Sequence, residues 1–97
     1  MNPIGLSAGF DKNAHLINLI PSLGFGFAQV GTVTKNSYGG NEKPRLYRLP
    51  KSKSILVNYG LKNEGVDSIL RRINISRHAD TILSLSIGRT NSKETIN

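Results

Sequence analysis

The chain has 97 residues, with 13 Lys and Arg against 6 Asp and Glu, and it contains no cysteine. This length allows one small domain with a single core. The absence of cysteine excludes a disulfide framework and a cysteine-based zinc site, and it fits a reducing compartment. Any redox chemistry would therefore need a bound cofactor.

The net charge of +7 favours an anionic partner in principle. The basic residues are scattered, however, and few aromatic residues lie among them to stack bases. We therefore expect no nucleic-acid binding. No stretch approaches the ~20 apolar residues of a membrane-spanning helix, and the N-terminus lacks the basic start of a signal peptide. We expect the chain by itself to be soluble.

The first third of the chain predicts a strand, a helix and a second strand. Residues 3–10 are a short apolar run, typical of a buried strand. Residues 13–23 carry apolar side chains at helical spacing and end at Gly24, and Pro21 should kink or shorten that helix. Residues 25–33 are again apolar and β-prone. This order predicts a βαβ unit.

A hairpin is predicted next. Turn residues fill positions 38–44, and residues 45–49 and 54–59 flank Pro50, which favours a small irregular hairpin. Such an insertion is long for a loop between a strand and a helix.

The last part of the chain predicts a helix, a third strand and a polar loop. Residues 63–73 return to helical spacing, with acidic residues early and arginines late, the order that the helix dipole favours. Residues 82–87 are typical of a strand, and residues 88–95 are polar. Alternating strands and helices imply a parallel sheet. Three strands and two helices cannot cover both faces of such a sheet, so we interpret the chain as part of a larger fold.

The loop at 8–13 is the first candidate site, because ligands gather at the carboxyl ends of parallel strands. Its small residues would let the backbone approach a flat ring, and Lys12 could donate to a carboxylate or to an oxygen of such a ring. The alternative is a solvated loop in which Asp11 or Asn13 caps a helix.

Two later loops have the same ambiguity. The hydroxyls of residues 31–34 could bind a ligand or cap the next element, and residues 58–65 could bind a ligand or form a turn and a helix cap. His15 and His78 have no partners at metal-ligand spacing, so we expect no metal site.

Six segments of the chain form an ordered set: residues 2–13, 24–27, 30–34, 40–49, 58–67 and 85–89. Taken in order, these segments resemble the opening part of quinone-dependent dihydroorotate dehydrogenases. The resemblance implies a partial (β/α)8 TIM barrel of the α/β class, with the first three βα units and a small hairpin insertion. Residues 1–97 would then be the N-terminal part of a single FMN-binding domain. In that family, dihydroorotate is oxidised to orotate by hydride transfer to FMN, which reduces a quinone, as a step of pyrimidine biosynthesis.

The resemblance also implies site residues, carried over by position. Two positions depart from the family pattern: Val57 and Ser86 stand where the family has asparagine. We therefore expect weaker substrate contact, unless Asn58 shifts to take the place of the missing asparagine, and lower flavin affinity. The expected flavin contacts are Ala8, Gly9, Phe10, Asp11, Lys12, Thr32 and Ser86, and the expected substrate contacts are Lys12, Val57, Asn58, Tyr59, Gly60 and Leu61.

The family's serine base and its FMN phosphate loops match no residues of this sequence. We therefore expect no catalytic residue within the chain and no turnover by the chain alone. The family is associated with the cytoplasmic side of the bacterial inner membrane or with the mitochondrial inner membrane, through segments that this sequence does not contain. The alternative hypothesis is a short basic interaction module derived from a half-barrel, which would associate with itself or with an anionic partner.

Overall fold

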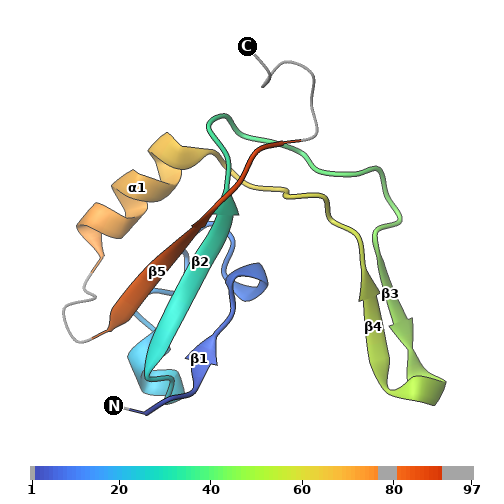
Figure 1. Cartoon of the computed structure of the whole chain (residues 1–97), viewed down its shortest axis with the longest axis horizontal. Coiled ribbons are helices and arrows are strands. Elements are labelled where there is room, and N and C mark those ends of the chain that lie inside the picture. The colour runs from blue at the N-terminus through green and yellow to red at the C-terminus, as the bar shows by residue number, and fades with distance from the viewer. Residues whose placement is uncertain (1, 77–80, 91–97) are drawn as a thin grey trace.

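The computed structural model describes residues 2–76 and 81–90 of the chain. It combines a three-stranded parallel sheet, one α-helix and a separate antiparallel hairpin (Figure 1). The fold is therefore mixed α/β, as the sequence predicts. The sheet has the order β1 (Gly5–Leu6), β2 (Phe27–Val33), β5 (Ile82–Ile87); the hairpin consists of β3 (Leu46–Leu49) and β4 (Ser54–Val57); the helix is α1 (Val66–Ile75).

The pairing of β2 with β5 is irregular near its carboxyl end. Val30 lies opposite Leu85 and Val33 opposite Ile87, so the register shifts between them. Gly31 lies in this stretch with φ +109°, and a Cβ there would come within 2.5 Å of the Ser86 carbonyl oxygen. Only glycine combines this backbone conformation with such a close approach. The irregularity lies at the end of the sheet where ligands usually bind.

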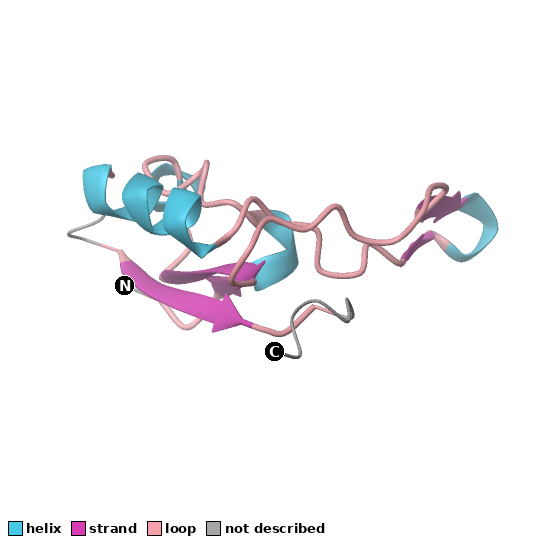
Figure 2. Cartoon of the chain, turned by 90° about the horizontal axis from the view of Figure 1, so that it is seen from above, coloured by secondary structure: helices cyan, strands magenta, loops and turns pink. Residues whose placement is uncertain are grey.

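The core lies between α1 and one face of the sheet (Figure 2). Ile69 of α1 is fully buried, as is Val30 of β2. Ala14 and Ile17, from the connection between β1 and β2, complete this cluster beneath the helix. Burial of these apolar groups is the main force that holds the helix to the sheet.

The opposite face of the sheet is polar where β2 meets β5. The Gln29 side-chain amide donates to the Ser84 hydroxyl over 3.2 Å, and the hydroxyls of Thr32 and Ser86 lie 2.9 Å apart. The described helix α1 lies on the other face (Figure 2). The molecule measures only 17 Å along its shortest axis, which leaves room for about two layers of secondary structure.

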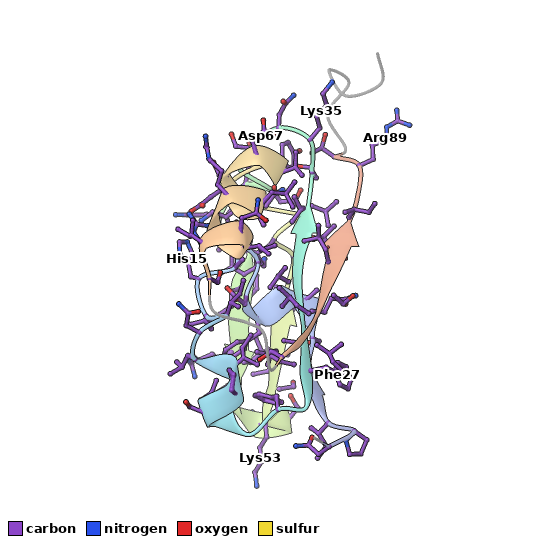
Figure 3. All side chains as sticks on the ribbon, turned by 90° about the vertical axis from the view of Figure 1, so that its left-hand side faces the viewer. His15, Phe27, Lys35, Lys53, Asp67 and Arg89 are labelled. Atoms are coloured by element: carbon purple, nitrogen blue, oxygen red, sulfur yellow. The ribbon has the colours of Figure 1, made fainter. Side chains whose placement is uncertain are left out.

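The hairpin extends away from the sheet (Figures 1 and 2). Its strands pair antiparallel from Leu46 opposite Val57 to Leu49 opposite Ser54, and a 3₁₀ turn at Pro50–Ser52 joins them. All eight strand residues are exposed, although most are apolar. The predicted hairpin is confirmed. In Figure 3, Lys53 marks its tip at one end of the molecule, while Lys35 and Arg89, which follow β2 and β5, lie together at the other end.

The helix predicted at residues 13–23 is wrong. The chain forms separate turns there, and only Ile20–Leu23 is a 3₁₀ helix. Ala14 has φ +60°, which an α-helix does not allow, and Pro21 has no N–H to continue a helix. His15 therefore lies in an irregular loop. Gly24 does end the segment, in the left-handed conformation.

The first predicted strand is also too long. Of residues 3–10 only Gly5 and Leu6 form a strand, and Ala8–Phe10 form a 3₁₀ turn. The second strand and the third strand are confirmed, at Phe27–Val33 and Ile82–Ile87.

The second predicted helix is confirmed but displaced, to Val66–Ile75 instead of 63–73. It begins late because the side-chain oxygen of Asn63 accepts a hydrogen bond from the backbone amide of Gly65. This bond holds residues 63–65 in a turn. No helix within residues 2–76 and 81–90 is long and apolar enough to cross a membrane.

Candidate functional site

A cleft of about 680 Å³ lies between the loop after β1 and the base of the hairpin. It brings together two segments that are far apart in the sequence, residues 9–13 and residues 57–62. These are parts of the loop expected to bind flavin and of the segment expected to bind substrate. The lining residues are Gly9, Phe10, Asp11, Lys12, Asn13, His15, Leu16, Leu46, Val57, Tyr59 and Lys62.

Lys12 is the central cation of this cleft. Its ammonium lies 4.0 Å from the centroid of the Tyr59 ring, a cation–π contact. Burial in the cleft lowers the pKa of Lys12, and the positive charges of Arg45 and Lys62 lower it further. A bound anion would relieve this repulsion, so the cleft favours a negatively charged ligand.

Arg45 is a functional candidate that the sequence did not single out. The residue is only 8% exposed. Its Nη1 donates to the carbonyl oxygens of Gly39, over 2.6 Å, and Asn41, over 2.9 Å. Its guanidinium carbon lies 4.8 Å from the Tyr59 ring centroid. The sequence carries no signal that distinguishes Arg45 from the neighbouring Lys43 and Arg48.

Asp11 is occupied by its own loop. The carboxylate accepts hydrogen bonds from the backbone amides of His15, over 2.8 Å, and Leu16, over 3.0 Å, and the residue is only 3% exposed. The alternative of a solvated loop with a helix cap at Asp11 is wrong as stated, because Asp11 is buried and its carboxylate binds the amides of a turn and not of a helix. The Asp11 carbonyl oxygen also accepts from the Gly31 amide over 3.3 Å, which ties this loop to β2.

Thr32 and Ser86 form a second group of expected contacts. Their hydroxyl oxygens lie 2.9 Å apart, and both residues are half-buried on the face of the sheet opposite α1. Neither residue lines the cleft around Lys12. The structure thus brings these two expected flavin contacts together, outside the lining of that cleft, although the neighbouring Gly31 is hydrogen-bonded to Asp11 of the loop. Ala8 is half-buried in the first 3₁₀ turn, beside the cleft-lining Gly9.

The expected substrate segment is fixed mainly by backbone bonds. The Asn58 backbone amide donates to the Arg45 carbonyl oxygen over 2.9 Å, and the Asn58 side-chain oxygen accepts from the Asn41 side-chain amide over 3.0 Å. Asn58 therefore engages Asn41, while Val57 and Tyr59 line the cleft. Gly60 and Leu61 both have positive φ, +70° and +65°, in the turn that follows.

Comparison with known proteins decides the family of this chain. The family model described as "Dihydroorotate dehydrogenase" matches residues 1–97. The chain belongs to the dihydroorotate dehydrogenase family. The resemblance inferred from the sequence is thereby confirmed.

Two similar relatives have the name "Dihydroorotate dehydrogenase (quinone)". The dihydroorotate dehydrogenase (quinone) of Pseudoalteromonas translucida is 44% identical over 96 residues, and that of Pseudomonas putida is 47% identical over 88. These matches cover 99% and 91% of this chain but only 28% and 26% of the relatives. The chain therefore spans about a quarter of their length.

Solved dihydroorotate dehydrogenase structures have the same backbone arrangement. The Eimeria tenella enzyme in complex with ferulenol superposes with a TM-score of 0.84 at 35% identity, over 95% of this chain and 26% of that one. The ligand-free enzyme from the same organism gives a TM-score of 0.83, also at 35% identity, over 95% of this chain and 28% of that one.

Glu64, Arg72 and His15 form an ion-pair cluster beside the loop after β1. Glu64 lies 2.8 Å from Arg72 and 3.4 Å from the ring of His15, and its backbone amide donates to the Asn13 side chain over 3.0 Å. The described parts of the chain contain no group of three or more His, Cys, Asp or Glu placed to hold a metal. His78, the other histidine considered for metal binding, lies outside the described residues.

Proposed function

We propose that this chain forms the part of a quinone-dependent dihydroorotate dehydrogenase that contacts the flavin ring of FMN and the carboxylate of dihydroorotate. The observation that carries the proposal is the position of Lys12. Its ammonium lies in a cleft lined by both segments that the family resemblance assigns to these ligands. A protonated lysine donates strong hydrogen bonds to carboxylates and to anionic oxygens.

The fold supports assignment to the first three βα units of a (β/α)8 barrel. The parallel strands neighbour one another in chain order, β1 then β2 then β5. The only described α-helix lies on one face, and polar pairs such as Gln29–Ser84 line the other. In such barrels the helices form an outer ring and side chains fill the interior. The chain would then belong to a single FMN-binding domain.

Two features of the described residues support the binding of a flavin ring. A Cβ at Gly9 would meet nothing within 4 Å, so the loop after β1 leaves open space beside the backbone. Of the two hydroxyls of Thr32 and Ser86, one donates to the other, which leaves one proton to donate to an acceptor such as a flavin carbonyl. FMN, when bound, would supply the hydride acceptor for dihydroorotate oxidation.

The chain's own residues would bind and orient. Lys12 would donate to the substrate carboxylate or to a flavin oxygen and stabilise the negative charge that develops near it. Val57 places an alkyl group in the cleft where the family has asparagine, so this contact adds packing but no hydrogen bond. The quinone acceptor implies action at the bacterial inner membrane or the mitochondrial inner membrane, reached through other segments of the protein.

The proposal is tested by transplanting this chain. The matching quarter of the Pseudoalteromonas translucida enzyme is replaced by residues 1–97, and FMN content and dihydroorotate-dependent quinone reduction are measured. We expect a flavin-loaded, active chimera. Lys12→Ala should reduce kcat/KM by about 100-fold, the cost of losing one charged donor at a reacting centre.

Lys51→Ala is the control for this experiment, because Lys51 lies in the 3₁₀ turn at the tip of the hairpin and does not line the cleft. It should leave activity unchanged. A folded chimera that binds no FMN, or one that binds FMN but does not oxidise dihydroorotate, would contradict the proposal.

A further inference from the structure

Two cations, Lys12 and Arg45, contact the aromatic ring of Tyr59. The Lys12 ammonium is 4.0 Å and the Arg45 guanidinium carbon 4.8 Å from the centroid of its ring. We propose that Tyr59 is a positioning residue, whose ring, held in place by Arg45 and by the loop at 39–41, directs the ammonium of Lys12 into the cleft. The consequence for catalysis rests on the function proposed above, whereas the positioning itself does not.

Lys12 needs a neighbouring group that fixes its ammonium, because its side chain is flexible. A lysine carries its charge on a flexible four-carbon stem and loses considerable entropy when its head is fixed. Lys12 is only half-buried in a cleft of about 680 Å³, which would allow several rotamers. The electron-rich face of Tyr59 attracts an ammonium and so gives one of these rotamers an advantage.

The backbone of Tyr59 is held firmly. Its carbonyl oxygen accepts a hydrogen bond from the Asn41 amide over 2.8 Å. Gly40 has φ +79°, and a Cβ there would lie 2.1 Å from the same carbonyl oxygen, so the two loops touch at a point where only glycine fits. The ring of Tyr59 therefore projects into the cleft from a fixed base.

Arg45 holds the other side of this arrangement. Its guanidinium is buried and anchored to the Gly39 and Asn41 carbonyl oxygens, so its charge cannot move away from the ring. The same charge repels the ammonium of Lys12, which is one cause of the lowered pKa of Lys12. Attraction by the Tyr59 ring and repulsion by Arg45 together leave Lys12 one favourable position.

Lysine NMR tests the positioning directly. In the chain with labelled lysine, the ring current of Tyr59 should shift the ε-methylene protons of Lys12 upfield, and the Lys12→Arg variant identifies their signal. Tyr59→Phe should keep this shift, because it keeps the ring, and Tyr59→Leu should abolish it. Tyr47→Leu is the matched control, since Tyr47 is an exposed hairpin residue outside the cleft.

Kinetics in the flavin-loaded chimera test the consequence. Tyr59→Leu should lower kcat/KM for dihydroorotate about tenfold, since small misplacements of a contacting group reduce the rate strongly. Tyr59→Phe should restore most of the rate, and Tyr47→Leu should not change it. If Tyr59→Leu fails to fold, replacement of Tyr59 by pentafluorophenylalanine keeps the shape of the ring but removes its attraction for cations, and it should lower the rate similarly.

The outcomes separate this inference from the proposed function. An unshifted Lys12 signal in the unaltered chain, or a Tyr59→Phe variant as impaired as Tyr59→Leu, would overturn the positioning role. A ring-current shift that disappears in Tyr59→Leu without any change in kcat/KM would overturn the consequence for catalysis. An inactive chimera whose Lys12 signal is shifted would contradict the proposed function and leave the positioning of Lys12 supported.

Discussion

The side chain of Asn63 is hydrogen-bonded to Thr34, which lies 29 residues earlier in the chain. The Asn63 amide nitrogen donates to the Thr34 hydroxyl over 2.8 Å, and the Thr34 backbone amide donates to the Asn63 side-chain oxygen over 3.2 Å. The same side chain donates to the Leu61 carbonyl oxygen and accepts from the Gly65 amide, both over 2.8 Å. One buried amide thus joins the end of β2 to the start of α1.

Replacement of Asn63 should therefore destabilise the fold strongly. Asn63→Ala leaves several buried polar groups without partners, and we expect a loss of about 3 kcal/mol in the free energy of unfolding. Asn63→Asp keeps the acceptor oxygens but loses the donors, so at neutral pH it should also be less stable. Urea unfolding followed by circular dichroism measures both variants. A loss below about 0.5 kcal/mol for Asn63→Ala would show that the network is not important for stability.

The strands β2 and β5, the hairpin and α1 could be predicted from the sequence, because their apolar and turn residues follow the pattern of each element. The segment at 13–23 could not. Ile17 and Ile20 are buried as its pattern requires, but Leu19 and Leu23 are exposed. The same spacing of apolar residues arises from successive turns, and the decisive features were a left-handed Ala14 and a carboxylate at Asp11 that binds the backbone.

The cleft was predictable only in part. The resemblance selected Lys12 and Tyr59 separately, one for the flavin loop and one for the substrate segment. The contact between them depends on how the loop after β1 meets the base of the hairpin, which is a tertiary relationship with no periodic signal. Arg45 was missed because burial of a cation is not visible in sequence. The alternative of a short basic interaction module stays a prediction.

Asp11 should contribute to stability more than to ligand binding. Its carboxylate satisfies two backbone amides of the loop, so Asp11→Ala should cost about 1–2 kcal/mol of unfolding free energy, as for the loss of a capping residue. Asp11→Asn keeps one acceptor oxygen and should lose about half as much. Thermal unfolding of the chain measures both. Equal stability of Asp11→Ala and the unaltered chain would contradict the assigned role.

Val57 should respond to restoration of the family residue. Val57→Asn places an amide in the cleft near Lys12, where it can hydrogen-bond a polar substrate. We expect the KM of the chimera for dihydroorotate to fall about fivefold, the effect of one added hydrogen bond of about 1 kcal/mol. Ile55→Asn is the control, because this hairpin residue is exposed and does not line the cleft. An unchanged or increased KM in Val57→Asn would count against substrate contact at this position.

Glu64 should make stability depend on pH in the acidic range. The hydrogen bond from Arg72 lowers the pKa of Glu64 below its ordinary value of 4.5, desolvation opposes this effect in part, and His15 adds a smaller contribution that lowers the pKa further. Because the folded pKa lies below the unfolded one, the unfolded chain binds more protons between the two values. The stabilisation is therefore complete above the unfolded pKa and is lost as the pH falls through the folded pKa.

Glu64→Gln should lower the unfolding free energy at pH 7 by less than about 1 kcal/mol, since the pair is partly exposed and screened by water. The difference from the unaltered chain should vanish at about pH 2, where the carboxyl group is neutral in both states, and it should shrink in 1 M salt. Glu42→Gln, an exchange on the exposed loop before Pro44, is the control. If Glu64→Gln lost the same stability at both pH values, its effect would come from packing of the side chain, and the ion pair with Arg72 would contribute nothing to the fold.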